Sequence, residues 1–365
     1  MTEIKTAIIV GGGIAGVMTA YSLYQRGYSC TILEKNDSLM SEASGNKKAI
    51  INPVLSHESE EHCAFLQSAF IESTSFYQNI PSGFSQCGAI QLAVNKKIKK
   101  LICDMDKNSV PNPLANVVSL KDFFPQLDGS ALFYPLAGIL TPKEILKYLL
   151  EHSSFTAELQ EEVIDFEESI SEVVVKTQSG RYSAQLCIFA NSYYAAKFFN
   201  FPLEAVRGEV VEVASSMLPN IHLTLPLCFN GYLIPLNEAA YLLGSTYDHG
   251  IFDRECNFER QNILIDRVKN IVPNVDHSTT STLPGRVSFR ASTPDKLPIV
   301  GPVRRNSRVF VNIGHGSRGF QTAVTSARFL SDFIIEKSDI PKIIDASRDL
   351  DRKSLQWKRY PWECE

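Results

Sequence analysis

Three glycines near the N-terminus have the spacing of a nucleotide-binding loop. Gly11, Gly13 and Gly16 form a GxGxxG motif, which follows an apolar, β-branched run at residues 6–10 and precedes apolar residues with helical spacing. In that setting the first glycine permits a tight turn, the second lets a pyrophosphate approach the backbone, and the third permits close packing of the helix. Ile14 and Ala15 would then belong to the first helical turn, whose free N–H groups and positive dipole end bind phosphate.

A carboxylate follows at the distance that a ribose contact requires. A second apolar strand is predicted over residues 30–34, and it ends in Glu34, 18 residues after Gly16 and just before Lys35. Glu34 would accept hydrogen bonds from the adenosine ribose hydroxyls and would repel a 2′-phosphate, so FAD or NAD is favoured over NADP. An ordinary glycine-rich turn is the alternative that the glycines alone leave open.

Two further loops have the composition of cofactor-binding segments. Ala43-Ser44-Gly45-Asn46 suits a loop beside a second phosphate or a ribitol chain, although alone it is also typical of a simple turn. Near the other end of the chain, a strand predicted over residues 309–313 leads into a glycine-rich loop and a helix. That helix start could direct N–H groups at the pyrimidine edge of a flavin. The two glycine-rich junctions fit the opposite ends of one FAD better than two separate nucleotide sites. The residues of the second loop are Gly314, His315, Gly316, Ser317, Arg318 and Gly319.

The elements that position these loops alternate along the chain. Helices are predicted over residues 58–79, 143–150 and 193–200, and strands over 88–94, 172–177, 185–190, 208–213 and 240–246. We therefore expect an α/β fold (α+β overall), in which a doubly wound, Rossmann-like domain is interrupted by a second domain built on a mostly antiparallel sheet.

The composition of the chain excludes several classes of protein. The chain has 365 residues, 44% of them hydrophobic and 21% charged, which is typical of a globular protein and excludes disorder. No apolar stretch is long enough to cross a membrane and no signal peptide is evident, so we expect a cytoplasmic protein without a membrane partner. The eight cysteines lack CxxC spacing, so neither a metal site nor a disulfide framework is expected.

The net charge of −4 means that any nucleic-acid contact must be local. Each basic cluster is also compatible with an ordinary solvated surface. The candidate clusters are Lys47-Lys48, Lys96-Lys97 with Lys99-Lys100, Arg304-Arg305, and Arg348, Arg352, Lys353, Lys358 and Arg359 near the C-terminus.

Together these motifs resemble the D-amino-acid oxidase and glycine oxidase superfamily. Within it the chain looks most like the FAD-dependent oxidase domain of the bifunctional tRNA 5-methylaminomethyl-2-thiouridine biosynthesis proteins, MnmC. The resemblance covers residues 7 to about 330. Besides the loops above, the segments that carry it are Asn52-Pro53-Val54-Leu55, residues 86–92, Val206-Arg207-Gly208, residues 227–235 and residues 293–301.

The resemblance implies an activity: oxidative removal of the carboxymethyl group from 5-carboxymethylaminomethyluridine, with or without a 2-thio group, at the tRNA wobble position. The products would be 5-aminomethyluridine and glyoxylate. Because the first strand is predicted to start at Thr6, we expect no methyltransferase domain before it and a separate methyltransferase acting downstream. A free amino-acid oxidase or dehydrogenase acting on glycine, sarcosine or a D-amino acid is the first alternative, and an FAD-binding module without turnover is the second.

The resemblance also implies roles for particular residues. Arg290 lies where the superfamily places its carboxylate clamp, and a guanidinium can hold a carboxylate with two parallel hydrogen bonds. Arg207 is the second candidate, although it could instead support the sheet junction, and Tyr232 could donate its hydroxyl to the carboxylate. His315 and Arg318 are assigned to the cofactor or an anionic substrate. FAD should be non-covalent, because no cysteine lies between Cys256 and Cys364.

With this resemblance, the expected domain boundaries are discontinuous. The FAD-binding domain, of the D-amino-acid oxidase type, would comprise residues 1–82, 141–202 and 285–346. The substrate-binding sheet domain would comprise residues 83–140 and 203–284, and residues 347–365 would form a C-terminal extension.

Overall fold

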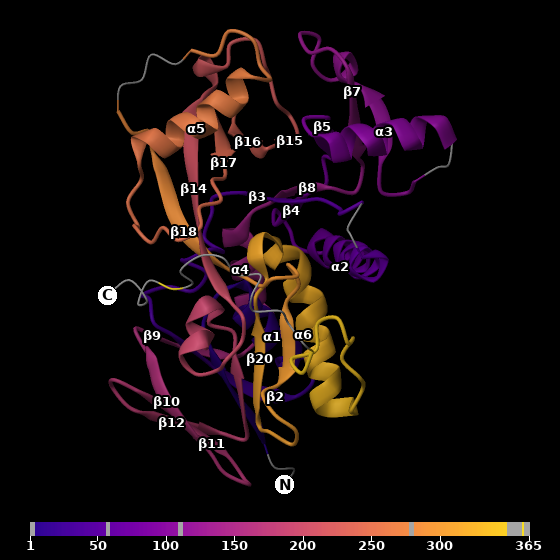
Figure 1. Ribbon diagram of the computed structural model, residues 1–365. Helices are drawn as coiled ribbons and strands as arrows, with labels where there is room; N and C mark the ends of the chain where they lie inside the picture. The colour runs from indigo at the N-terminus through magenta and orange to yellow at the C-terminus, as the bar shows by residue number, and fades with distance from the viewer. Residues whose placement is uncertain (1–3, 56–58, 109–111, 277–280, 349–359, 361–365) are drawn as a thin grey trace.

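A six-stranded sheet joins the two ends of the chain in the computed structural model, which describes residues 4–55, 59–108, 112–276, 281–348 and 360. Its strand order is β19-β20-β13-β1-β2-β9, and every neighbouring pair is parallel except β19 with β20. N-terminal and C-terminal strands therefore lie in one sheet (Figure 1). The strands are β1 (Lys5–Val10), β2 (Tyr28–Glu34), β9 (Thr156–Leu159), β13 (Leu186–Phe189), β19 (Ile299–Pro302) and β20 (Val309–Ile313).

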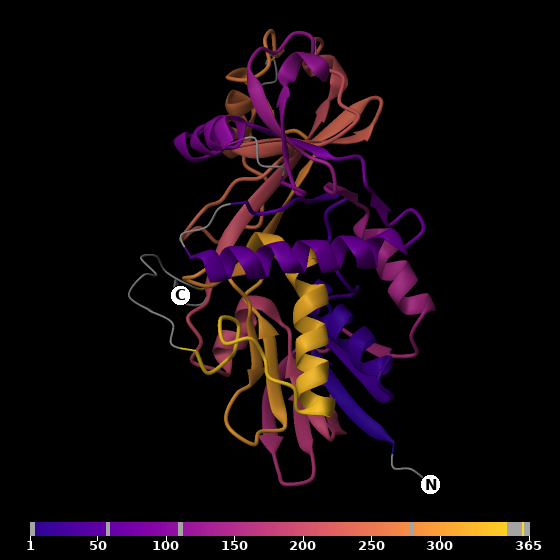
Figure 2. The same ribbon diagram turned by 90° about the vertical axis from the view of Figure 1, so that its right-hand side faces the viewer.

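Both faces of this sheet are covered. On one face lie α1 (Ile14–Tyr24) and α6 (Gly319–Glu336); α4 (Pro142–Glu151) packs on α1, and α2 (Glu60–Gln78) crosses α6 (Figure 2). On the other face lies a small sheet of β10 (Val163–Glu168), β11 (Val173–Thr177) and β12 (Arg181–Ala184). Ala7 and Ile9 accordingly pack with the helices, whereas Ile8 and Val10 pack with the small sheet. This explains why β1 is apolar throughout.

An eight-stranded sheet forms the other half of the molecule, in the order β18-β14-β17-β16-β15-β5-β7-β6. Neighbouring strands are antiparallel except β15 and β5. The buried side chains of Leu264, Ile265 and Val268 on α5 (Phe258–Lys269) belong to the core of this half, and α3 (Lys96–Asn108) contacts β6 and β7. The strands are β5 (Ala89–Leu92), β6 (Asn116–Ser119), β7 (Ser130–Tyr134), β14 (Glu204–Ala214), β15 (Leu227–Phe229), β16 (Gly231–Asn237), β17 (Ala240–Gly244) and β18 (Gly285–Ser292).

Between the halves lies a three-stranded sheet of β3 (Ala49–Ile51), β8 (Gly138–Leu140) and β4 (Phe84–Ser85). Local signals set several helix starts. Ser59 accepts a hydrogen bond from the His62 N–H at the start of α2, Asn257 accepts one from the Arg260 N–H at the start of α5, and Pro142 occupies the first turn of α4.

The α/β class and the predicted strands agree with this architecture. The helix predicted over residues 193–200 is a 3₁₀ helix, Ser192–Lys197, whereas α3 and α5 were not predicted. β18 begins at the start of the segment expected in the FAD-binding domain, yet it pairs with β14 in the eight-stranded sheet. By strand pairing, the two halves therefore divide after β18. Most of the expected C-terminal extension lies outside the described residues. Within the described part of the chain, no helix is long and apolar enough to cross a membrane.

Candidate active site

The first glycine-rich loop joins β1 to α1 by a turn that excludes side chains. Gly11 has a φ of +100°, and a Cβ atom there would lie 2.7 Å from the Asn191 Cα. A Cβ on Gly16 would lie 1.9 Å from the Gly11 carbonyl oxygen, so a side chain there would push α1 away from the turn. A Cβ on Gly13 would meet only the Ser44 Oγ, at 3.6 Å. The backbone at Gly13 is therefore open to the approach of a phosphate group.

Glu34 lies beside this loop at the end of β2. Its carboxylate accepts hydrogen bonds from the Gly12 N–H at 2.6 Å and from the backbone and side-chain nitrogens of Asn36 at 2.9 and 2.7 Å. It is 6% exposed and lines the cavity described below. Lys35 donates to the Tyr194 hydroxyl at 2.9 Å. Glu34 is thus fixed where it can accept ribose hydroxyl groups.

The loop at residues 43–46 is held against the start of α1. Ser44 Oγ accepts a hydrogen bond from the Ile14 N–H at 3.0 Å, and Asn46 Oδ1 accepts one from Arg286 Nη1 at 2.8 Å. Arg286 also donates to the carbonyl oxygens of Ser41 and Glu42 at 2.6 and 2.9 Å. Arg286 of β18 therefore positions this loop from the other half of the molecule. No local pattern of residues around Arg286 indicates that role.

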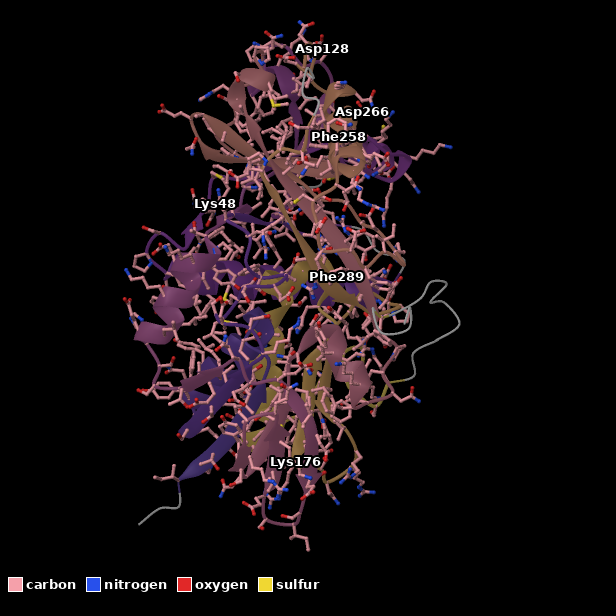
Figure 3. The ribbon with its side chains drawn as sticks, turned by 90° about the vertical axis from the view of Figure 1, so that its left-hand side faces the viewer. Lys48, Asp128, Lys176, Phe258, Asp266 and Phe289 are labelled. Atoms are coloured by element: carbon pink, nitrogen blue, oxygen red, sulfur yellow. The ribbon has the colours of Figure 1, made fainter. Side chains whose placement is uncertain are left out.

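A single cavity of about 380 Å³ connects the two glycine-rich loops. It also reaches Phe289, which lies near the middle of the molecule (Figure 3). Gly16 and Gly45 pack behind the loops and do not line it. Of the residues predicted to bind the cofactor, those that line it are Gly11, Gly13, Ile14, Ala15, Glu34, Lys35, Ala43, Ser44, Asn46, Gly314, His315, Gly316, Ser317, Arg318 and Gly319. An extended dinucleotide with a phosphate at Gly13 and a ribose at Glu34 fits this arrangement.

His315 is held as a neutral group in the second glycine-rich loop. Its Nδ1 lies 2.8 Å from Thr322 Oγ1, and its Nε2 lies 3.1 Å from Asn312 Oδ1. Burial lowers the pKa of His315 to about 4. The imidazole is therefore uncharged near neutral pH and ties the end of β20 to the first turn of α6.

Arg290 supplies a positive charge at the end of the cavity nearest the eight-stranded sheet. Its Nη2 donates to Ser245 Oγ at 2.6 Å and its Nη1 to the Thr246 carbonyl oxygen at 3.3 Å. Throughout residues 4–55, 59–108, 112–276, 281–348 and 360, no carboxylate forms an ion pair with Arg290. A guanidinium without a carboxylate partner, facing a cavity, can receive the carboxylate of a ligand.

Two glycines make room for the side chains of this anion site. A Cβ on Gly208 would lie 2.4 Å from Arg290 Nη2, and a Cβ on Gly244 would lie 2.6 Å from the Tyr232 hydroxyl. Burial raises the pKa of Tyr232, despite the opposing effects of Arg290 and Ser245. Tyr232 therefore remains protonated at neutral pH and can donate a hydrogen bond into the cavity.

Arg318 adds a second guanidinium to the cavity wall. None of its side-chain nitrogens forms an ion pair within the described ranges, and desolvation lowers its pKa without removing its charge. The cavity thus has a glycine-lined end suited to phosphates and an opposite end with two available cations.

Arg207 has a different environment from the other candidate residues. It is fully buried outside the cavity, where it pairs with Glu209 at 2.9 Å, Asp253 at 2.9 Å and Asp248 at 3.3 Å. On the paired strands Arg290 lies opposite Val206, so Arg207 projects from the other face of the sheet. Its surroundings match the alternative of a residue that supports the sheet junction.

Comparison with models of known protein families identifies the family to which the chain belongs. Residues 6–333 match the model of the DAO family, described as FAD dependent oxidoreductase. The chain belongs to this FAD-dependent oxidoreductase family. FAD is therefore the cofactor, as the two glycine-rich loops predicted, and the cavity contains residues that fit it. In the described part of the chain, no group of three or more His, Cys, Asp or Glu residues could hold a metal ion.

Curated relatives confirm the resemblance to the MnmC oxidase domain within this family of FAD-dependent oxidoreductases. The tRNA 5-methylaminomethyl-2-thiouridine biosynthesis bifunctional protein MnmC of Methylobacillus flagellatus is 26% identical over 95% of this chain and 59% of its own length. The protein of the same name from Aeromonas salmonicida is 28% identical over 82% of this chain and 48% of its own length. The chain thus spans about half to three-fifths of these relatives.

Solved structures confirm the fold of this FAD-dependent oxidoreductase. Glycine oxidase from Geobacillus kaustophilus has a TM-score of 0.79 at 20% identity, covering 94% of this chain and 99% of its own. L-proline dehydrogenase from P. horikoshii has a TM-score of 0.74 at 18% identity, covering 93% of this chain and 95% of its own.

Proposed function

We propose that the enzyme oxidises the N-carboxymethyl group of 5-carboxymethylaminomethyluridine, with or without a 2-thio group, at the tRNA wobble position. The products would be 5-aminomethyluridine and glyoxylate. The observation that carries this proposal is the pair formed by Arg290, which has no carboxylate partner in the described ranges, and Tyr232, a hydroxyl donor on the same cavity. This pair suits a carboxylate on a glycine-like arm. The name of the MnmC relatives supports a tRNA as the carrier of that arm.

The reaction requires positioning more than acid–base chemistry. FAD, when bound, accepts the hydride from the carbon between the amine and the carboxylate. Arg290 would hold the carboxylate with two parallel hydrogen bonds, and Tyr232 would donate a third, so that this carbon is kept in one orientation. The resulting substrate C=N bond takes up water and separates into the primary amine and glyoxylate. No protein group needs to remove a carbon-bound proton, which is consistent with His315 being neutral and fully engaged.

The substrate's phosphates would need a basic surface, and α3 provides a candidate. Lys96, Lys97, Lys99 and Lys100 are exposed, and no ion pair joins them to the described part of the chain. Four cations in the first turns of a helix oppose the helix dipole and repel one another at i,i+3 and i,i+4 spacing. Binding a polyanion would relieve both effects.

In the other candidate clusters, several of the described cations already have partners. Lys47 pairs with Glu212, Lys48 donates to Thr141 and Arg304 pairs with Glu168. Arg348 pairs with Asp295, and Arg352, Lys353, Lys358 and Arg359 lie outside the described residues. We further propose a cytoplasmic enzyme whose product passes to a separate methyltransferase.

Oxidation of a free amino acid is the second candidate. The fold is similar to that of glycine oxidase, and the Arg290 and Tyr232 pair would accept the carboxylate of glycine or sarcosine equally well. The two candidates differ in what must remain outside the cavity: a tRNA in one case and nothing in the other.

Anaerobic reduction of the flavin separates these candidates. The holoenzyme is mixed in turn with unmodified tRNA, carboxymethylaminomethyl-tRNA, glycine and sarcosine, while flavin absorbance, glyoxylate and the modified nucleoside are measured. We expect rapid bleaching only with the modified tRNA, with one glyoxylate per 5-aminomethyluridine. Faster bleaching by a free amino acid would overturn the proposal, and no bleaching by any of the four would favour an FAD-binding module without turnover.

A further inference from the structure

An exposed aromatic ring lies beside the anion site. Tyr247 follows β17 and is 40% exposed. Arg290 Cζ lies 5.8 Å from its ring centroid, and Arg318 is close enough to interact electrostatically with its hydroxyl. Both arginines line the cavity, whereas Tyr247 does not. The ring therefore lies at the edge of the cavity, next to the end that would receive the substrate carboxylate.

Lys296 approaches the same ring from the segment after β18. Its Nζ lies 5.8 Å from the Tyr247 ring centroid and donates to Ser292 Oγ at 3.0 Å. Ser292 Oγ also lies 3.3 Å from the Tyr247 hydroxyl. Lys296 has a φ of +63°, a left-handed conformation that residues other than glycine adopt at a cost. One serine thus holds the ring and the ammonium group together.

The positive charge of this cluster is not neutralised by its neighbours. For the residues that the structure describes, no ion pair involves Arg290, Lys296 or Arg318. Asp295, adjacent to Lys296 in the chain, pairs with Arg348 at 3.1 Å instead. Two cations, Arg290 and Lys296, therefore each lie 5.8 Å from the centroid of one exposed aromatic ring, and the His249 ring packs edge-on against it at 5.1 Å.

An exposed ring flanked by cations is how proteins bind single-stranded nucleotides, because bases stack on aromatic rings and phosphates pair with the cations. A free amino acid, whose carboxylate would already be held in the cavity, would need neither group.

We infer that Tyr247 and Lys296 form a nucleotide-binding edge of the active site. The Tyr247 ring stacks on the uracil whose carboxymethylaminomethyl arm enters the cavity toward Arg290, and Lys296 contacts a phosphate of the same single-stranded segment. This inference rests on the proposed function and extends it, since it assigns the recognition of the base to residues outside the cavity.

The test measures binding as well as turnover. A fluorescent RNA anticodon stem–loop carrying 5-carboxymethylaminomethyluridine is titrated with the holoenzyme of wild type, Y247F, Y247A and K296M. K337M is the control for K296M, because Lys337 is also a left-handed lysine, with a φ of +60°, but caps the end of α6 away from the cavity. Binding of N-acetylglycine, which has the carboxylate but no base, is measured from the flavin spectrum in the same variants.

We expect the stem–loop Kd to rise about tenfold or more in Y247A, while Y247F and K337M stay close to wild type. K296M should weaken binding and reduce its dependence on salt by about one ion. In Y247A and K296M, the affinity for N-acetylglycine should change far less than the affinity for the stem–loop.

Other outcomes would overturn the inference. Equal losses for the stem–loop and N-acetylglycine would mean that Tyr247 only positions Arg290. Wild-type stem–loop binding in Y247A would remove the stacking role while leaving the proposed function intact. If wild-type holoenzyme neither binds nor oxidises the stem–loop but oxidises sarcosine, the proposed function fails and this inference fails with it.

Discussion

Replacing Gly208 by alanine should displace the carboxylate clamp without unfolding the protein. The added Cβ would lie 2.4 Å from Arg290 Nη2 and 2.5 Å from its Cζ and Nη1, whereas ordinary contacts begin at 3.4 Å. The guanidinium must therefore move by about 1 Å, and a misplacement of that size costs about 100-fold in rate when geometry controls the reaction. The atoms that must move belong to the free end of a flexible side chain, so we expect the free energy of unfolding to fall by less than about 1 kcal/mol.

Anaerobic stopped-flow reduction of the flavin by the best substrate measures this loss, and the flavin spectrum measures FAD content. Gly180→Ala is the matched control, because a Cβ there meets nothing within 4 Å. A Gly208→Ala enzyme that reduces its flavin at the wild-type rate would refute the assignment of Arg290 as the clamp. A variant that fails to fold or to retain FAD would show that the guanidinium cannot move as we reason.

Three further predictions concern other parts of the site. Arg290→Met should retain FAD, but its rate of flavin reduction by substrate should fall about 100- to 10,000-fold, because the substitution removes two charge-assisted hydrogen bonds. The rate of Arg290→Lys should lie between those of Arg290→Met and wild type. Equal rates in all three proteins would reject the role of Arg290 as the clamp. The pKa of His315 is lowered from 6.5 to about 4, so between these pH values the unfolded chain binds more protons than the folded chain. The contribution of neutral His315 to the free energy of unfolding, about 3 kcal/mol, should therefore be present above pH 6.5 and be lost as the pH falls toward 4. Urea unfolding of wild type and His315→Gln across that range should show that the free energy of unfolding falls more steeply with decreasing pH in wild type. The same pH dependence in both proteins would contradict this. The KM for modified tRNA should rise, and its salt dependence should fall, when the charges of the four α3 lysines are reversed, namely Lys96, Lys97, Lys99 and Lys100. Reversing the charges of Lys143 and Lys147 on α4 should change both quantities much less. Equal effects of the two sets would show that α3 is not part of the RNA-binding surface.

The parts of the fold that the sequence predicted were those whose cause is local. The tight turn at Gly11, the close packing at Gly16 and the carboxylate ending β2 each follow from residue types at short spacing, and the structure places them as expected. The helix α3 was not predicted, because lysines dominate its first turns and suggest a solvated basic surface more than a packed helix. Its apolar residues Ile98, Leu101 and Met105 have helical spacing and pack against the core, so that signal was present.

What the sequence could not provide was the register between distant strands. Arg290 was the first and Arg207 the second candidate for the clamp, and the sequence alone left both open. Only the pairing of Val206 with Arg290 places them on opposite faces of the sheet. Arg286 was missed for the same reason, because its partners lie more than 200 residues away in the loop at residues 41–46.

Because one cavity connects the two glycine-rich loops, bound FAD would contact both of them and would link the N-terminal and C-terminal parts of the chain. Gly13 and Gly316 are about 300 residues apart in the chain, yet they line the same cavity, and their strands β1 and β20 are separated in the sheet only by β13. Any partial opening that draws the first and last strands apart would therefore have to release FAD. Loading with the flavin should slow hydrogen exchange at both ends of the chain together, because the ligand stabilises only the form in which the ends are joined.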